Sequence, residues 1–168
     1  LTLAPNDDMM LRNFGDGGRG LGTSLQIATG NFPSALRVAD LNADSKPDVV
    51  VANRSDNDVS VYLNAGDGGL SAPVDYPVAL GPQAIAVGDL NGNGVPDLVV
   101  ANTSNANMSV LMGMGGGTFA AATHISLVAA PTDLELGDFT GDGHLDVIVS
   151  RSNNFDAVLL AGNGAGGF

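Results

Sequence analysis

The chain has 168 residues, 44% of them hydrophobic, which is enough for one domain with a buried core. Its net charge is −12, with only six Lys and Arg, which argues against binding nucleic acid or an anionic membrane surface through a basic patch. No cysteine is present, so disulfides and thiolate metal sites are excluded, and no segment approaches the roughly 18 apolar residues of a membrane span.

The order of elements along the chain repeats every 49 residues. Pro33, Pro82 and Pro131 are in phase, and each opens a segment that leads into an acidic loop. Each loop is followed by an apolar strand, a polar turn and a second strand. The first of these strands is expected at 48–52, 97–101 and 146–150, and the second at 58–63, 107–112 and 156–161. Glycine clusters, expected to be turns, come next at 15–18, 66–69, 113–117 and 162–167, and a further strand is expected after the first three, at 25–29, 74–78 and 124–128.

Four short strands in a repeat of this length, without helical periodicity, predict an all-β fold of β-propeller blades. The length corresponds to about 3.4 repeats (168/49) of four antiparallel strands. We expect a partial blade at 1–32, blades at 33–81 and 82–130, and a partial blade at 131–168. The first would lack its first strand and the last its fourth. The propeller would then be completed by other blades of a longer chain, which we favour, or by copies of itself.

The beginning of the sequence carries no visible signal peptide, and it starts with Leu1 rather than Met. A mature, processed or excerpted chain is therefore expected.

Three acidic loops of nine residues lie 49 residues apart, at 40–48, 89–97 and 138–146. Oxygen-bearing side chains occupy positions 1, 3, 5 and 9 of each loop. Eight of the 18 acidic residues lie in these loops, and three bound divalent cations would change the net charge from −12 to −6. The charge imbalance thus indicates a metal requirement.

Oxygen donors of this kind suit calcium, which takes about six to eight oxygens. Side chains at positions 1, 3 and 5 can converge on one ion, with the carbonyl of position 7 and the position 9 Asp closing the site. Transition metals fit poorly, because no loop offers His or Cys at a side-chain ligand position. Asn93 at position 5 of the second loop removes a carboxylate, and Ser45 takes the place of glycine at position 6 of the first loop. We therefore expect calcium affinity to be highest in the third loop, lower in the first and lowest in the second.

A purely structural interpretation competes with the metal hypothesis, because Asp and Asn are common in turns where their side chains bond local backbone. Three in-phase copies favour the metal.

These loops, the strands after them and glycine turns such as 14–18 resemble the FG-GAP or VCBS-type repeats of integrin α-subunit propellers and bacterial surface proteins. The resemblance implies that each loop joins the first two strands of a blade and that calcium rigidifies the blade. Carried over by position, the implied ligands are Asp40, Asn42, Asp44, Lys46 (carbonyl), Asp48, Asp89, Asn91, Asn93, Val95 (carbonyl), Asp97, Asp138, Thr140, Asp142, His144 (carbonyl) and Asp146.

Support for catalysis is weak, because His124 lies in an expected outer strand and His144 in a loop, and no nucleophile motif is present. Glu135 and Arg37 lie at the same level two repeats apart, and an ion pair between blades is the simplest expectation.

We expect a non-enzymatic, calcium-binding scaffold of a secreted or cell-surface protein of a prokaryote, which acts in adhesion or self-assembly. Its partner would be a surface protein or glycan. The alternative is a non-catalytic or carbohydrate-binding module of a larger secreted enzyme or lectin, although the chain has no Trp and only 5% aromatic residues.

Overall fold

A computed structural model describes residues 2–3, 9–15, 21–66, 69–152 and 156–168. All its regular elements within these ranges are β-strands, which pair antiparallel. The predicted all-β propeller fold is confirmed. The expected turns at 15–18, 66–69 and 151–155 lie partly outside the described residues.

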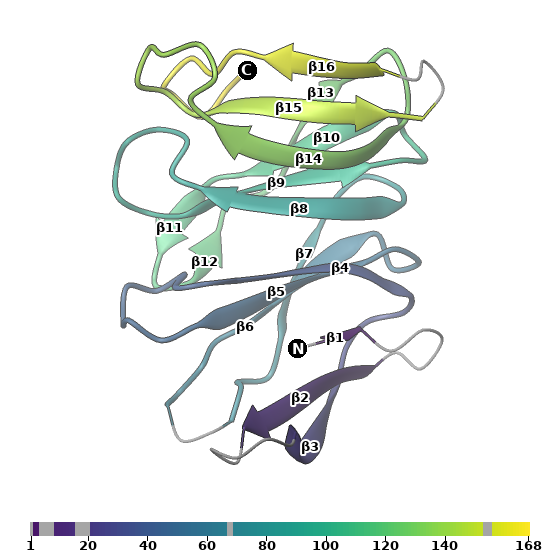
Figure 1. Cartoon of the computed structure of the whole chain (residues 1–168), viewed down its shortest axis with the longest axis vertical. Helices are drawn as coiled ribbons and strands as arrows, with labels where there is room; N and C mark the ends of the chain where they lie inside the picture. The colour runs from purple at the N-terminus through teal and green to yellow at the C-terminus, as the bar shows by residue number, and fades with distance from the viewer. Residues whose placement is uncertain (1, 4–8, 16–20, 67–68, 153–155) are drawn as a thin grey trace.

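Four main sheets follow one another along the chain (Figure 1). The N-terminal sheet has β1 (Thr2–Leu3), β2 (Met9–Gly15) and β3 (Leu21–Ala28). Blade one has β4 (Pro33–Ala39), β5 (Asp48–Asn53), β6 (Asp58–Tyr62) and β7 (Val74–Pro77). Blade two has β8 (Pro82–Gly88), β9 (Asp97–Asn102), β10 (Asn107–Leu111) and β13 (Thr123–Ser126). Blade three has β14 (Pro131–Gly137), β15 (Asp146–Arg151) and β16 (Asp156–Leu160).

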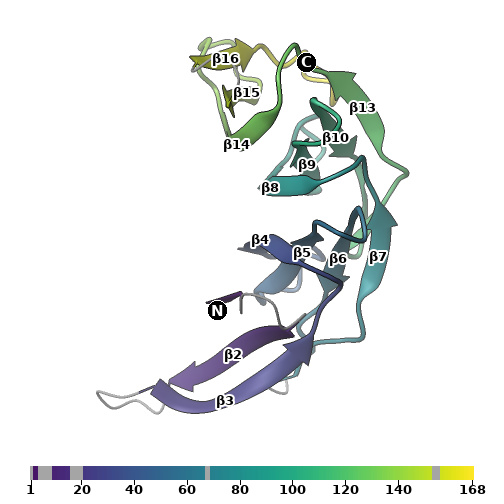
Figure 2. The same cartoon turned by 90° about the vertical axis from the view of Figure 1, so that its right-hand side faces the viewer.

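The sheets are arranged side by side along an arc (Figure 2). The first strands β4, β8 and β14 lie on its concave side, and the fourth strands β7 and β13 lie on its convex side. Strand order within blades one and two follows the chain, so each acidic loop joins the first two strands of its blade. Ala39 pairs with Asp48 and Gly88 with Asp97, and these pairs hold the two ends of a loop together.

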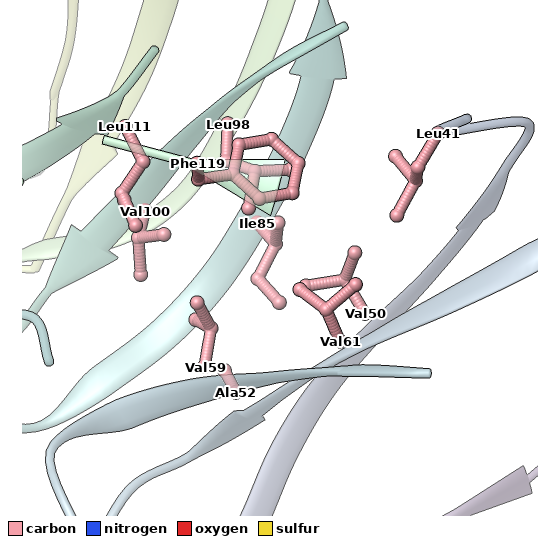
Figure 3. Close-up of a cluster of buried hydrophobic side chains, with 10 residues drawn as sticks. All are labelled: Leu41, Val50, Ala52, Val59, Val61, Ile85, Leu98, Val100, Leu111 and Phe119. Atoms are coloured by element: carbon pink, nitrogen blue, oxygen red, sulfur yellow. The ribbon is translucent and has the colours of Figure 1, made fainter. Parts of the chain in front are cut away.

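The hydrophobic core lies between the blades, because the alternation of a β-strand gives each sheet two apolar faces. Val50 and Val61 of blade one pack with Ile85 and Leu98 of blade two (Figure 3). Val99 of blade two, on the opposite face, packs with the next blade. β5 and β9 are buried at every residue because both of their faces are covered.

Two details differ from the sequence expectations. The glycine-rich segment after β10, expected to be a turn, contains a short hairpin of β11 (Gly113–Gly115) and β12 (Thr118–Phe119). The strand expected at 25–29 begins earlier, at Leu21. Glycine tolerates the left-handed backbone at 115–117, so three successive residues with φ between 61° and 84° make the hairpin turn.

The expected pair between Arg37 and Glu135 is confirmed. Arg37 Nη2 lies 3.9 Å from Glu135 Oε1, across β8. Both side chains are more than a third exposed, so the pair contributes little stability. Within the described part of the chain, no helix has the length and apolar character needed to cross a membrane.

Candidate metal-binding loops

The three acidic loops share one backbone conformation. Positions 4 and 6 have positive φ in every copy: Ala43 (62°) and Ser45 (64°), Gly92 (73°) and Gly94 (81°), Gly141 (76°) and Gly143 (86°). Glycine adopts this conformation without steric cost, whereas a side chain strains it. The first loop therefore carries strain that the other two avoid.

Side-chain oxygens of positions 1 and 3 meet at one backbone amide in the first two loops. The amide of Asp44 donates to Asp40 Oδ1 at 3.1 Å and to Asn42 Oδ1 at 3.0 Å. The amide of Asn93 donates to Asp89 Oδ1 and Asn91 Oδ1, both at 3.1 Å. The turn thus gathers oxygens from alternate residues around a small volume.

The third loop has a different pattern of hydrogen bonds. The Asp138 carboxylate accepts from the amides of Gly141, Asp142 and Gly143. The Thr140 amide donates instead to Asp146 Oδ2 at 2.8 Å.

The side chain at position 5 accepts a hydrogen bond from the backbone amide two residues further along its loop. Asp44 Oδ1 accepts from the Lys46 amide at 2.9 Å, and Asp142 Oδ1 accepts from the His144 amide at 2.9 Å. Hydrogen bonds to the charged form favour it. The Lys46 amide accordingly lowers the pKa of Asp44, and the Gly94 amide, first among several, lowers the pKa of Asp89.

The position 9 carboxylate is fully buried in each loop. Asp97 Oδ2 accepts from the Leu90 amide at 2.8 Å, and its Oδ1 accepts from the Gly113 amide at 2.6 Å. Asp48 and Asp146 make the equivalent pairs of bonds, and the Gly162 amide is the main cause of the lowered pKa of Asp146. Position 9 thus fastens the loop to the segment that leaves the third strand.

The Lys46 side chain adds a cation to the first loop. Its Nζ lies 3.2 Å from Asp44 Oδ2 and donates to the carbonyl oxygen of Ala65 at 3.3 Å. Val95 and His144 stand at the same position in the other loops. Of the three loops, only the first therefore has an ammonium group that competes with a metal, and it does so at the Asp44 carboxylate.

No group of three His, Cys, Asp or Glu side chains close enough to hold a metal occurs among the described residues. Side-chain ligation in the loops stays a prediction. Sequence reasoning noted Ser45 but missed Ala43, although Gly92 and Gly141 at the same phase were a signal. It also missed the structural bonds of position 9, which join residues 16 apart.

Comparison with solved structures finds related folds. A lectin of Agrocybe aegerita, described as recognising non-reducing terminal N-acetylglucosamine, is 22% identical, with a TM-score of 0.65 over 96% of this chain and 45% of its own. BBS1N in complex with ARL6DN is 17% identical, with a TM-score of 0.58 over 88% of this chain and 42% of its own. The Photorhabdus luminescens Tc holotoxin pore is 18% identical, with a TM-score of 0.51 over 94% of this chain and 8% of its own.

These likenesses show the fold, and the chain spans less than half the length of each of these proteins. Comparison with curated proteins gives no match. The FG-GAP-like repeat family matches residues 40–100 and 89–149, so each match starts at the first Asp of a loop and ends in the strand after the next loop. The chain therefore belongs to the FG-GAP-like repeat family.

Proposed function

We propose that this chain is a calcium-stabilised propeller segment of a secreted or cell-surface protein, which acts as a non-catalytic scaffold for adhesion or assembly. The observation that carries the proposal is the threefold repetition of one loop backbone with oxygen donors at fixed positions. Calcium prefers hard oxygen donors of this kind, whereas transition metals prefer nitrogen and sulfur donors.

The donor set fits calcium in each loop. Asp40, Asn42 and Asp44 would hold the ion in the first loop, with the Lys46 carbonyl and Asp48. The corresponding residues would do so in the other two loops: Asp89, Asn91, Asn93, Val95 and Asp97, then Asp138, Thr140, Asp142, His144 and Asp146. Bound calcium would supply positive charge to carboxylates that otherwise repel one another.

The proposed partners follow from blade three. Its outer face presents Ile148 and Leu159, both partly exposed, at the positions where blade two has the buried Val99 and Val110. Cover by another blade of a longer chain or by a second copy would bury this face as the interior blades bury theirs.

The test is thermal unfolding of the 168-residue chain in calcium, in magnesium and in a chelator. Calcium is expected to raise the melting temperature, since each loop would stabilise the fold by about 2.7 kcal/mol when free calcium is a hundred times its Kd. Magnesium should act less, because it demands a tighter octahedral geometry. Equal melting temperatures in calcium and chelator would overturn the proposal.

Two variants locate the effect. Asp142→Ala removes a carboxylate from the third loop, and Asn93→Ala removes a neutral amide from the second. The calcium-dependent gain should fall more for Asp142→Ala. Sedimentation in calcium then distinguishes a 16.8 kDa monomer from a multimer in which copies cover each other's outer faces.

A further inference from the structure

Three Asn-Gly pairs occur in the chain, at 91–92, 93–94 and 163–164. In such a pair the backbone nitrogen of the glycine can attack the side-chain carbonyl carbon of the asparagine, because glycine has no side chain to hinder the approach. The first two pairs lie in the second acidic loop. The third lies in the turn at 163–167, which follows β16 and which we call the Asn163 turn.

The Asn163 turn holds the asparagine side chain with two backbone amides. Oδ1 of Asn163 accepts from the amide of Ala165 at 2.9 Å and from the amide of Gly167 at 3.0 Å. The amide of Asn163 donates to the carbonyl oxygen of Gly167 at 2.9 Å, which closes the turn. Both donors to Oδ1 are therefore fixed by the backbone and do not depend on a mobile side chain.

Gly167 makes this arrangement possible. A Cβ at Gly167 would lie 2.8 Å from Nδ2 of Asn163, which is closer than a side chain allows. The asparagine amide group can therefore lie against the backbone of Gly167. Gly164 and Gly166 have φ of 66° and 86°, which glycine adopts without steric cost. The turn is thus built from glycines around one asparagine side chain.

The imidazole of His144 covers the second residue of the pair. A Cβ at Gly164 would lie 2.6 Å from Nδ1 of His144 and 2.9 Å from its Nε2, so the ring packs directly on the glycine. His144 comes from the third acidic loop, at the position where Lys46 packs on Gly66 in the first blade. A neutral imidazole has one nitrogen that can accept a proton. A proton acceptor therefore lies beside the residue that supplies the nucleophile.

The two pairs in the second loop lack this combination. Within the described residues, Oδ1 of Asn91 accepts one backbone amide, that of Asn93 at 3.1 Å, and Oδ1 of Asn93 accepts one, that of Val95 at 2.7 Å. The Gly94 amide donates to Asp89 Oδ2 at 2.7 Å, a bond that must break before its nitrogen can attack. A Cβ added to the glycine of either pair meets no atom within 4 Å, so no imidazole lies on them.

We propose that Asn163 deamidates through its glycine neighbour and that the Asn163 turn promotes this reaction. The Gly164 nitrogen bonds to Cγ of Asn163 as its proton passes to the His144 imidazole. Negative charge develops on Oδ1, where the Ala165 and Gly167 amides stabilise it. The bond from Cγ to Nδ2 then breaks, the imidazole returns the proton, and ammonia leaves. The product is a cyclic succinimide.

Water completes the reaction, and Asn163 is exposed to it. Water opens the succinimide at one carbonyl to give aspartate, or at the other to give isoaspartate, in which the main chain runs through the former side chain. One amide and one water are consumed, one carboxylate and one ammonia are formed, and nothing is oxidised or reduced. The reaction occurs once in each chain and needs no metal, so it does not depend on the proposed calcium sites. It adds one negative charge beside the third acidic loop.

The experiment is peptide mapping by mass spectrometry after incubation of the folded 168-residue chain in a chelator. Conversion at Asn163 should be about tenfold faster than at Asn91 or Asn93, because an additional amide donor and a proton acceptor act there. The three pairs serve as internal controls for one another in every sample. A rate at Asn163 equal to or below that of the other two pairs would overturn the proposal.

Incubation in urea tests whether the fold causes the difference. The three rates should converge there, because unfolding removes both the turn and the contact with the imidazole. A preference for Asn163 that persists in urea would show that the local sequence causes it, which contradicts the proposed role of the turn.

Two variants test the imidazole. His144→Phe keeps a ring beside Gly164 and removes the proton acceptor, so conversion at Asn163 should slow by about threefold or more, with Asn91 and Asn93 unaffected. His124→Phe is the matched control, because it removes the other histidine of the chain, in β13. Melting temperatures establish that both variants are folded. An unchanged rate at Asn163 in His144→Phe, or an equal loss in His124→Phe, contradicts the proposal.

Discussion

The backbone amide of Gly113 donates a 2.6 Å hydrogen bond to Oδ1 of Asp97, which lies at the end of the second acidic loop. Asn64 with Asp48, and Gly162 with Asp146, repeat this bond in the other two blades. The last aspartate of each loop is thus a structural residue of the blade, whether or not it also ligates a metal.

Asp97→Ala should therefore be strongly destabilising in the absence of metal. It leaves the buried amide of Leu90 and the partly buried amide of Gly113 without their acceptor, and we expect a loss of about 2–4 kcal/mol. Urea unfolding in a chelator measures it. Asn93→Ala, in the exposed part of the same loop, should cost less than about 1 kcal/mol. Equal losses would contradict the structural role of Asp97.

Ala43→Gly with Ser45→Gly should stabilise the chain. Both residues have a positive φ that glycine adopts freely, although glycine also increases the entropy of the unfolded chain. We expect a net gain of about 0.5–1 kcal/mol for each substitution, seen as a higher melting temperature.

The reverse change in the second loop is the control for this prediction. A Cβ at Gly92 or Gly94 meets no atom within 4 Å, so alanine there tests backbone conformation alone. Gly92→Ala and Gly94→Ala should both lower the melting temperature. A rise in either would mean that φ does not govern the stability of these loops.

Lys46→Met should increase the affinity of the first loop for calcium. The substitution removes an ammonium 3.2 Å from Asp44 Oδ2, and an exposed ion pair of this kind contributes about 0.2–1 kcal/mol, which corresponds to a gain of up to about fivefold. A calcium titration that follows the Ser45 amide resonance separates this loop from the others. Val95→Lys should weaken the second loop. If neither variant changes calcium affinity, the Lys46 ammonium does not weaken calcium binding by the first loop.

Asp58→Asn should stabilise the chain at neutral pH. Burial, with repulsion from Asp75 and Asp56, raises the pKa of Asp58 above its ordinary value of 3.8. The folded state therefore binds this proton more tightly than the unfolded state, so the charged carboxylate lowers stability at pH 7 and this penalty disappears as the pH falls through the folded pKa. The gain should be at most about 1 kcal/mol, because solvent screens a partly exposed group.

Blade two supplies the precedent for this change. Asn107 stands where blade one has Asp58, with its Oδ1 3.0 Å from the Asn102 side-chain amide. Unfolding of both proteins at pH 7 and below pH 3.8 measures the difference. A gain that persists at low pH would show that charge is not its cause.

Much of the fold could be predicted because it is local and repeated. Each strand is a short apolar run, and each loop places Asp or Asn at alternate positions, so the 49-residue phase identified the hairpins at 40–48, 89–97 and 138–146. The same phase placed Arg37 opposite Glu135.

The rest depends on contacts between residues that the 49-residue repeat does not relate to one another. The two bonds of Asp97 join it to residues on both sides of a strand pair, and nothing in the spacing of the loop indicates which amides it meets. The surface hollow lined by Phe32, Leu80 and Ser104 needs residues of two blades, and only the packed structure brings these residues together.

The β11–β12 hairpin of blade two contacts the acidic loop of blade one. The Gly117 amide of blade two donates to the carbonyl oxygen of Leu41 in the loop of blade one, and Leu41 is buried. At the same loop position, Leu90 is buried in the cluster against which Phe168 packs, whereas Phe139 is 52% exposed. A loop is covered by the blade that follows it. During synthesis from the N-terminus, the first loop therefore acquires its full support only after residues up to 119 have left the ribosome, so each loop matures one blade behind its own strands.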